Sequence, residues 1–207
     1  MLGAVAAALV AGYLLGSVPV AVLVARVRGV DPRRAGDGNP GYWNVKQLLG
    51  RRAAVPVFAG NALKGTLAAL AGVAAGLALG LGGHDRMVLA WVGTAAAMVG
   101  HAWPVFAHFQ GGRSILTFTG GVAVWSPRVF ALCVGALLLV WVATRSFAWA
   151  TRVGVFATPM ATLLVDGIWR TGALGLLLSL IGLRFVLAAR PGRSGPATGA
   201  PAAPPPR

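Results

Sequence analysis

Long apolar segments separated by short polar loops dominate the chain. A helix that crosses a bilayer needs about 20 mostly apolar residues to pass through about 30 Å of hydrocarbon. The hydrophobic pattern predicts about seven membrane segments, near residues 1–25, 54–80, 87–106, 115–126, 129–144, 153–165 and 172–189. The fourth and sixth are short, which favours partly re-entrant or broken helices. The predicted fold class is therefore all-α, a polytopic integral membrane protein.

The two ends of the chain differ in character. The first apolar run has no basic leader and no polar cleavage region, so we interpret it as a membrane span and not as a signal peptide. From residue 191 onward the sequence is rich in Pro, Ala and Gly and has no apolar periodicity. We predict a membrane domain over residues 1–190 and a disordered cytoplasmic tail over residues 191–207.

Composition and charge narrow the choice of partner. The chain is 57% hydrophobic, above the roughly 45–50% that is usual for soluble domains. Its 18 Lys and Arg residues against 4 Asp and Glu residues give a net charge of +14, which in a soluble protein would suggest nucleic acid. Here the charges lie in short loops between apolar helices. We therefore expect membrane lipid or a phosphorylated substrate as the partner, and no nucleic acid.

The basic residues also predict an orientation in the membrane. Loops that alternate between the two faces leave Arg86, Arg128 and Arg170 on one side. The other side receives the larger set: Arg26, Arg28, Arg33, Arg34, Lys46, Arg51, Arg52, Arg113, Arg145, Arg152, Arg190, Arg193 and Arg207. By the positive-inside rule this second side is cytoplasmic, which places the N-terminus outside and the C-terminus inside.

The first polar stretch that could carry chemistry is the loop over residues 31–44, DPRRAGDGNPGYWN. Its glycines allow backbone amides to approach an anion closely, and two asparagines and two arginines add donors and charge. The residues of interest are Arg33, Gly36, Gly38, Asn39, Gly41 and Asn44. An ordinary loop punctuated by Asp-Gly and Asn-Pro turns would have the same composition, so both interpretations stay open.

The second stretch covers residues 100–113, GHAWPVFAHFQGGR. His101 lies at a predicted membrane boundary, and its imidazole suits proton transfer near neutral pH. Gly111 and Gly112 could form an amide nest, and the planar guanidinium of Arg113 could bind phosphate. The alternative is that His101 is a hydrogen-bonded structural group and that the aromatic residues here form an interfacial belt.

Three further polar residues complete the set. Lys64 lies inside a predicted span, where an ammonium group is costly unless it faces a polar cavity, and Asn61 shares its helix face. Ser17 precedes Pro19 at the end of the first span and predicts a kink toward the same region. Arg145 begins the loop after the fifth span and could join the basic cluster or simply anchor that span.

In this order along the chain, the polar stretches resemble the acyl-phosphate:glycerol-3-phosphate acyltransferases, the PlsY family, from about Gly16 to Thr151. The family patterns are G-S-x-P, D-x-R-x-x-G-S-G-N-x-G-A-T-N, D-x-x-K-G, G-H-x-F-P-V-F with G-G-K-G, and T-R-Y-V-S-L. The matching residues are Gly16, Ser17, Pro19, Asp31, Arg33, Gly36, Gly38, Asn39, Gly41, Asn44, Lys64, Gly65, Gly100, His101, Pro104, Val105, Phe106, Gly111, Gly112, Thr144 and Arg145. The departures are Asp37, Tyr42, Trp43, Gln47, Asn61, Arg113, Ser114 and Ala148.

The resemblance implies that a fatty acyl group passes from acyl phosphate to glycerol 3-phosphate and forms lysophosphatidic acid, at the cytoplasmic face of a bacterial-type inner membrane. It implies catalytic roles for His101, Arg113 and Asn44, and phosphate or acyl phosphate binding by Ser17, Arg33, Gly36, Gly38, Asn39, Gly41, Lys64, Gly111, Gly112 and Arg145. No metal and no cofactor is expected. Two alternatives remain: a diverged member that binds anionic lipid or acyl phosphate without turnover, and a small transporter.

Overall fold

The computed structural model describes residues 1–188, and the predicted tail at 191–207 lies outside the described residues. Within residues 1–188 every regular element is helical, which confirms the all-α prediction. The elements are α1 (Leu2–Ser17), α2 (Val20–Arg26), α3 (Tyr42–Ala78), α4 (Gly83–Ala102), the short 3₁₀ helix η1 (Val105–Ala107), α5 (Ile115–Trp125), α6 (Pro127–Thr144), α7 (Phe147–Asp166) and α8 (Ile168–Ala188).

Five helical stretches within residues 1–188 are long and apolar enough to cross a membrane: Leu2–Arg26, Tyr42–Ala78, Gly83–Ala107, Pro127–Thr144 and Ile168–Ala188. The other two segments are the ones predicted to be short. Helix α5 has 11 residues and rises about 16 Å, too little to span. Helix α7 has 20 residues, but Arg152, Pro159 and several threonines interrupt its apolar character.

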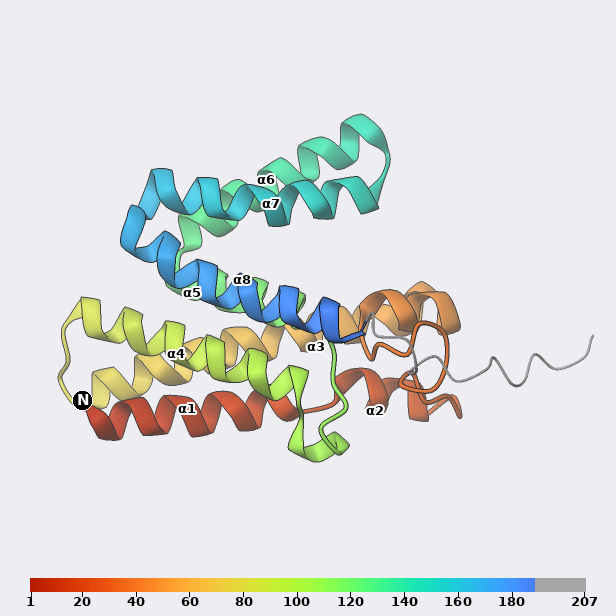
Figure 1. Cartoon of the computed structure of the whole chain (residues 1–207), viewed down its shortest axis with the longest axis horizontal. Coiled ribbons are helices and arrows are strands. Elements are labelled where there is room, and N and C mark those ends of the chain that lie inside the picture. Colours follow the sequence, from red (N-terminus) through yellow and green to blue (C-terminus); the bar gives the residue numbers. More distant parts are fainter. Residues whose placement is uncertain (189–207) are drawn as a thin grey trace, which may run out of the picture.

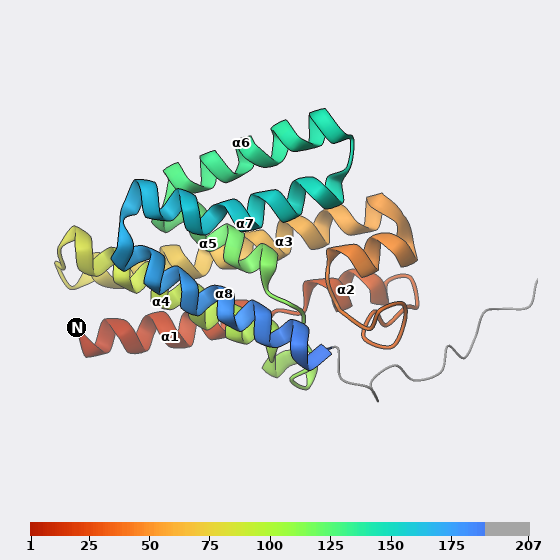
Figure 2. The same cartoon turned by 45° about the horizontal axis from the view of Figure 1, so that its top comes forward.

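Helices α1, α3, α4 and α5 pack into the main bundle, and α8 packs on α7 and also contacts α4 (Figures 1 and 2). Helices α6 and α7 form a hairpin that packs chiefly on itself. At the end of this hairpin, Asp166 accepts hydrogen bonds from the Ser126 hydroxyl and, at 2.9 Å, from Arg170. These contacts connect the hairpin to the junction between α5 and α6.

Glycines allow the bundle helices to approach each other backbone to backbone. A Cβ atom at Gly12 would come within 2.5 Å of the Gly93 carbonyl oxygen, and one at Gly65 would meet the Thr117 carbonyl oxygen at a still closer approach. Small residues at helix crossings are the usual way in which membrane helices gain packing energy, because lipid gives no hydrophobic drive for their association. The polar loops at the ends of these helices are consequently held close together.

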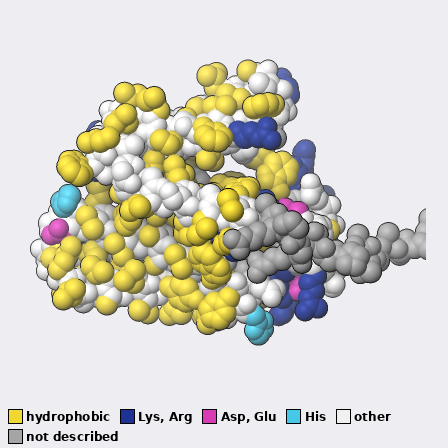
Figure 3. Space-filling model, viewed as in Figure 1, with side chains coloured by type: hydrophobic (Ala, Val, Ile, Leu, Met, Phe, Trp, Pro, Cys, Tyr) yellow, Lys and Arg dark blue, Asp and Glu magenta, His cyan; other side chains and the backbone are white. Residues whose placement is uncertain are grey.

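The polar loops gather on the side of the bundle away from the N-terminus. The segment that follows α2, the loop after α4, and the turn between α6 and α7 all lie on that side (Figure 1). In the space-filling view, most of the visible Lys and Arg side chains lie there too (Figure 3). The alternation of loops that underlies the orientation prediction is therefore seen in the fold, while the assignment of that side to the cytoplasm stays a prediction.

Two helices are broken close to this basic side. Helix α1 ends at Ser17, Val18 is extended with φ −61° and ψ 116°, and α2 begins after Pro19. Proline has no backbone N–H, so the chain cannot continue the hydrogen bonding of α1 through this point. The kink predicted from Ser17 and Pro19 is confirmed. Helix α3 begins 12 residues before the predicted span at 54 and is interrupted at Gly50, whose φ is +79°.

Candidate active site

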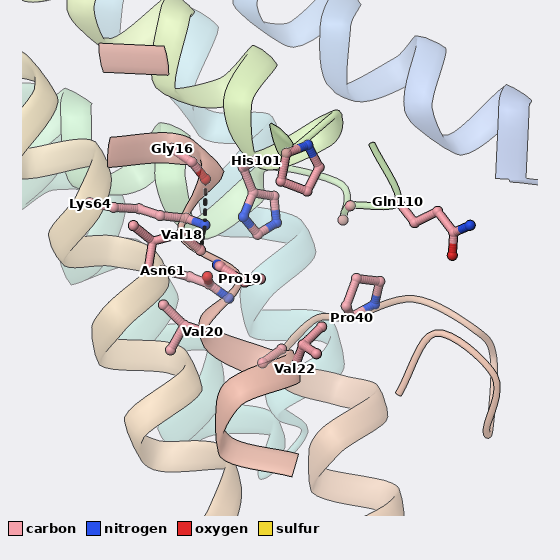
Figure 4. A pocket seen from close by; sticks show the side chains of 14 residues that line it. Gly16, Val18, Pro19, Val20, Val22, Pro40, Asn61, Lys64, His101 and Gln110 are labelled. Atoms are coloured by element: carbon pink, nitrogen blue, oxygen red, sulfur yellow. Dashed lines mark hydrogen bonds between the residues drawn. The ribbon is translucent and has the colours of Figure 1, made fainter. Parts of the chain in front are cut away.

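A cavity lies at the break between α1 and α2, with walls from α3, α4 and the loop after α4 (Figure 4). Its polar lining brings together residues from four separate parts of the sequence: Gly16, Asn61, Lys64, His101, Gln110, Gly111 and Gly112. Val18, Pro19 and Pro40 add apolar walls. The proximity of Lys64, His101, Gly111 and Gly112, which was expected from the sequence, is thus seen in the structure.

Lys64 stabilises the helix break. Its ammonium group donates to the carbonyl oxygens of Gly16 at 2.9 Å and Val18 at 3.1 Å, and the residue is only 5% exposed. The last carbonyl groups of a helix have no partner within the helix and carry partial negative charge, so a cation is favourable there. An ammonium group has three N–H donors. Two of them bond the carbonyl groups at the break, and the Lys64 side chain also lines the cavity.

His101 and Gly112 are closely packed at the other side of the cavity. His101 is buried near the end of α4, and its carbonyl oxygen accepts a hydrogen bond from the Gly112 amide at 3.0 Å. A Cβ atom at residue 112 would lie 2.5 Å from His101 Nε2, so only glycine fits here without moving the ring. The imidazole and Lys64 point into the same space from α4 and α3 (Figure 4).

Arg184 contacts the glycine turn of the cavity wall, although no sequence motif indicated it. It extends from α8, donates from Nε to the Gly112 carbonyl at 3.1 Å and from Nη2 to the Gly111 carbonyl at 2.8 Å, and lies 5.1 Å from the centre of the Trp103 ring. These contacts hold the glycine turn at the cavity wall. The available signal was an arginine inside a predicted span, since charged residues in membrane segments usually serve a function.

The loop over residues 31–41 folds around Asn44. This side chain is fully buried, and its Nδ2 donates to the carbonyl oxygens of Pro32 at 2.8 Å and Ala35 at 2.9 Å. Its Oδ1 accepts from the Asp37 amide at 3.2 Å. Gly36 has φ +64°, and a side chain there would collide with Asn44. The contacts of Asn44 give it a structural role in shaping this loop.

The amides of this loop are used differently from what the sequence suggested. The Gly38 amide donates to the Ala35 carbonyl at 3.2 Å, and the Gly41 amide donates to the Asn39 carbonyl at 2.7 Å. The Asn39 amide donates to an Asp37 carboxylate oxygen at 3.0 Å. These three amides were expected to be free for an anion, but each donates a hydrogen bond to an oxygen atom within the loop. Pro40 is the residue by which the loop reaches the cavity wall.

An ion pair fixes the base of the same loop. Arg33 Nη2 lies 2.7 Å from Asp31 Oδ2, and Arg33 Nη1 donates to the Ala107 carbonyl at 3.2 Å. The hydrogen bond from the Arg33 guanidinium holds the pKa of the Asp31 carboxyl below its ordinary value, and Asp31 in turn raises the pKa of Arg33. Arg33 therefore connects the loop before α3 to the loop after α4 and is already paired with a carboxylate.

Arg113 makes a second connection between these loops. Its Nη2 lies 3.6 Å from Asp37 Oδ2, and its guanidinium lies 4.6 Å from the centre of the Phe185 ring. Arg113 directly follows Gly112, which lines the cavity, but is not itself one of the lining residues. Asp37 and Arg113 are two of the positions at which the sequence departs from the family pattern, and the structure brings them together.

Of the residues expected at the site, Lys64, His101, Gly111 and Gly112 line the cavity, whereas nine do not: Ser17, Arg33, Gly36, Gly38, Asn39, Gly41, Asn44, Arg113 and Arg145. Ser17 is buried and donates to the Tyr13 carbonyl at 2.8 Å, inside its own helix. Arg145 is exposed at the turn between α6 and α7, with φ +55°. Among residues 1–188 no group of three or more His, Cys, Asp or Glu residues is placed to hold a metal ion.

The fold and the cavity define a polytopic helical membrane protein with a cationic, glycine-lined site at one end of its bundle. A family model described as glycerol-3-phosphate acyltransferase matches residues 6–190. The chain therefore belongs to the glycerol-3-phosphate acyltransferase family, as the resemblance indicated.

Individual relatives agree with this assignment. A glycerol-3-phosphate acyltransferase of Desulforudis audaxviator is 36% identical over 183 residues, which cover 87% of this chain and 88% of the relative. One from Rubrobacter xylanophilus is 42% identical over 156 residues, covering 74% of this chain and 73% of the relative.

Solved structures of PlsY, an integral membrane glycerol 3-phosphate acyltransferase, share the fold at 30% identity. The glycerol 3-phosphate form superimposes with a TM-score of 0.71 and covers 87% of both chains. The lysophosphatidic acid form gives a TM-score of 0.65 and covers 88% of this chain and 86% of the other.

Proposed function

We propose that this chain is a membrane acyltransferase that transfers a fatty acyl group from acyl phosphate to the 1-hydroxyl of glycerol 3-phosphate, giving lysophosphatidic acid for phospholipid synthesis. The observation that carries the proposal is the convergence of Lys64, His101 and the Gly111–Gly112 turn on one cavity at the basic end of a membrane bundle. Both substrates are anions and one carries a lipid chain. A cationic cavity beside hydrocarbon suits that pair.

The reaction needs positioning more than it needs a strong protein base. The acceptor oxygen attacks the acyl carbonyl carbon, a new ester C–O bond forms, and the bond between the carbonyl carbon and the phosphate oxygen breaks. Phosphate leaves with the electron pair, and the hydroxyl proton passes to a substrate phosphate oxygen or to His101. Developing oxyanion charge is stabilised by the remaining N–H donor of Lys64, because a fixed donor needs little reorganisation during the reaction.

The remaining site residues act around this centre. We assign Arg113 to the substrate phosphate at the cavity edge, since a planar guanidinium matches phosphate oxygens. Asn44 shapes the loop that carries Asp37, and Arg33 holds that loop against residue 107. We further propose that the basic end faces the cytoplasm of a bacterial-type inner membrane, with the N-terminus outside and the C-terminus inside.

The test is an acyl-transfer assay on purified full-length protein with acyl phosphate and radiolabelled glycerol 3-phosphate. We expect labelled lysophosphatidic acid, and at least about 10²-fold less product from Arg113→Ala, because the loss of a fixed cation removes both binding and orientation. A His101→Gln variant that keeps full turnover assigns the proton to substrate phosphate. No product above the level of Arg113→Ala would refute the proposed activity.

A second candidate is binding of acyl phosphate or anionic lipid without turnover. One observation favours it: the carboxylate of Asp37 lies beside Arg113, the cation assigned to the substrate phosphate. In this case phosphate-bearing ligands would raise the melting temperature of the protein while the acyl-transfer assay stays at background.

A further inference from the structure

The ion pair between Asp37 and Arg113 joins two loops that are far apart in the sequence. Asp37 belongs to the loop before α3, and Arg113 follows the glycine turn at the cavity wall. Their closest N–O distance is 3.6 Å, and the side chains are 42% and 29% exposed, respectively. A pair with this exposure is weak, so another anion can compete with it.

Asp37 is held in place from its own loop. Its amide donates to Asn44 Oδ1 at 3.2 Å, and its Oδ1 accepts from the Asn39 amide at 3.0 Å. Asn44 is fully buried, so this anchor is fixed. The second carboxylate oxygen, Oδ2, is the one that faces Arg113. The contact is therefore built into the loop.

Arg113 is positioned independently, from α8. Its guanidinium stacks on Phe185, and the turn just before it is held by Arg184 through the carbonyl groups of Gly111 and Gly112. The Nε atom of Arg113 is buried and has no hydrogen-bond partner among the described residues. This buried atom is out of reach of a ligand. A guanidinium has five N–H donors in a planar fork, and the ion pair with Asp37 engages one edge of it. Because the Arg113 side chain is 29% exposed, a further anion can reach the outer part of the guanidinium.

We propose that Asp37 is a specificity-determining residue: its carboxylate competes with the phosphate of the anionic acceptor for Arg113 and weakens acceptor binding. This inference rests on the proposed function, in which Arg113 takes a phosphate. An incoming phosphate either displaces Asp37 or binds beside it against like-charge repulsion. Neutralising Asp37 therefore strengthens phosphate binding, whereas neutralising Arg113 weakens it.

The experiment compares wild type with Asp37→Asn, Asp37→Ser, Asp37→Glu and Arg113→Gln, and with the double variant Asp37→Asn/Arg113→Gln. Asp85→Asn is the matched control, because it removes the same charge in the first turn of α4, whereas the loop that holds Arg113 follows the other end of this helix, which is about 30 Å long. KM for glycerol 3-phosphate and kcat are measured in the acyl-transfer assay. The dissociation constant of inorganic phosphate is measured by calorimetry.

We expect Asp37→Asn and Asp37→Ser to lower KM and the phosphate dissociation constant by about three- to tenfold, which is the scale of a partly exposed ion pair plus like-charge repulsion. Asp37→Glu keeps the charge, so we expect its KM and its phosphate dissociation constant to stay within about threefold of the wild-type values. In the Arg113→Gln background the effect of Asp37→Asn falls below about twofold, because the cation for which the two anions compete is gone.

An unchanged or raised phosphate dissociation constant in both Asp37→Asn and Asp37→Ser overturns the inference. An equal gain in phosphate affinity in Asp85→Asn overturns it too, since the effect would then come from the net charge of the protein and not from the position of Asp37. The two proposals fail separately. If no variant transfers acyl groups but phosphate binds more tightly to Asp37→Asn than to wild type, the proposed function is wrong and the competition stands.

Discussion

Replacing Arg184 by leucine tests whether the glycine turn at the cavity wall depends on α8. The change removes the hydrogen bonds from the guanidinium to the carbonyl groups of Gly111 and Gly112, and Arg184 as a residue is 9% exposed. Hydrogen bonds that involve a charged group contribute about 1.5–3 kcal/mol each. The lower end applies, because leucine also removes the cost of burying the charge. We expect a loss of about 3 kcal/mol, or a melting temperature lower by about 6–12 °C for a chain of this size.

The assay combines thermal unfolding in detergent with acyl-transfer kinetics at a temperature where the variant is folded. Because Arg184 positions the turn that precedes Arg113, we expect kcat to fall along with stability, and Arg184→Lys to recover part of both. Arg152→Leu is the matched control: it removes an exposed arginine that stacks 4.9 Å from the Trp149 ring. If Arg184→Leu melts within about 2 °C of that control and keeps its kcat, the assigned role of Arg184 is wrong.

Three further predictions follow from individual contacts. Gly112→Ala places a methyl group 2.5 Å from His101 Nε2, so we expect about 10²-fold lower kcat, whereas Gly135→Ala, with no atom within 4 Å, leaves kcat unchanged. Lys64→Met leaves the Gly16 and Val18 carbonyls at the helix break without their cation, and we expect a lower melting temperature than in Leu63→Met, which changes a residue that is 54% exposed on the same helix. The pKa of Asp31 is lower in the folded state than its ordinary value of 3.8, so the ionised carboxylate stabilises the fold at pH values above 3.8. This stabilisation is lost as the pH falls through the folded-state pKa, and we expect Asp31→Asn to flatten the dependence of melting temperature on acidic pH. An unchanged slope would contradict this.

The apolar runs were sufficient to predict most of the fold. Helices α4, α6 and α8 begin within about four residues of the predicted spans, because each is a continuous apolar stretch flanked by polar residues. The start of α3 was missed, because residues 42–52 contain Lys46, Arg51 and Arg52 and have no apolar run that would indicate a helix. Its first turns precede the break at Gly50.

The site was only partly predictable. The motifs indicated Lys64, His101 and the glycine turn, and these do line one cavity. Local sequence could not show that Arg184 bonds the Gly112 carbonyl, because the two residues are 72 positions apart. It also could not show that the amides of the 31–41 loop bond within that loop, since glycine permits both open and closed conformations.

Two departures from the family pattern, Asn61 and Asp37, change where negative charge lies around the site. Where the pattern has an aspartate three residues before Lys64, this chain has Asn61, which lines the cavity and whose Oδ1 is buried without a hydrogen-bond partner among the described residues. Where the pattern has a serine, this chain has Asp37 beside Arg113. A carboxylate is therefore absent beside Lys64, which lines the cavity, and present beside Arg113, which directly follows the lining residue Gly112. Under the proposed function, we expect Lys64 to attract an anionic substrate and Asp37 to repel it.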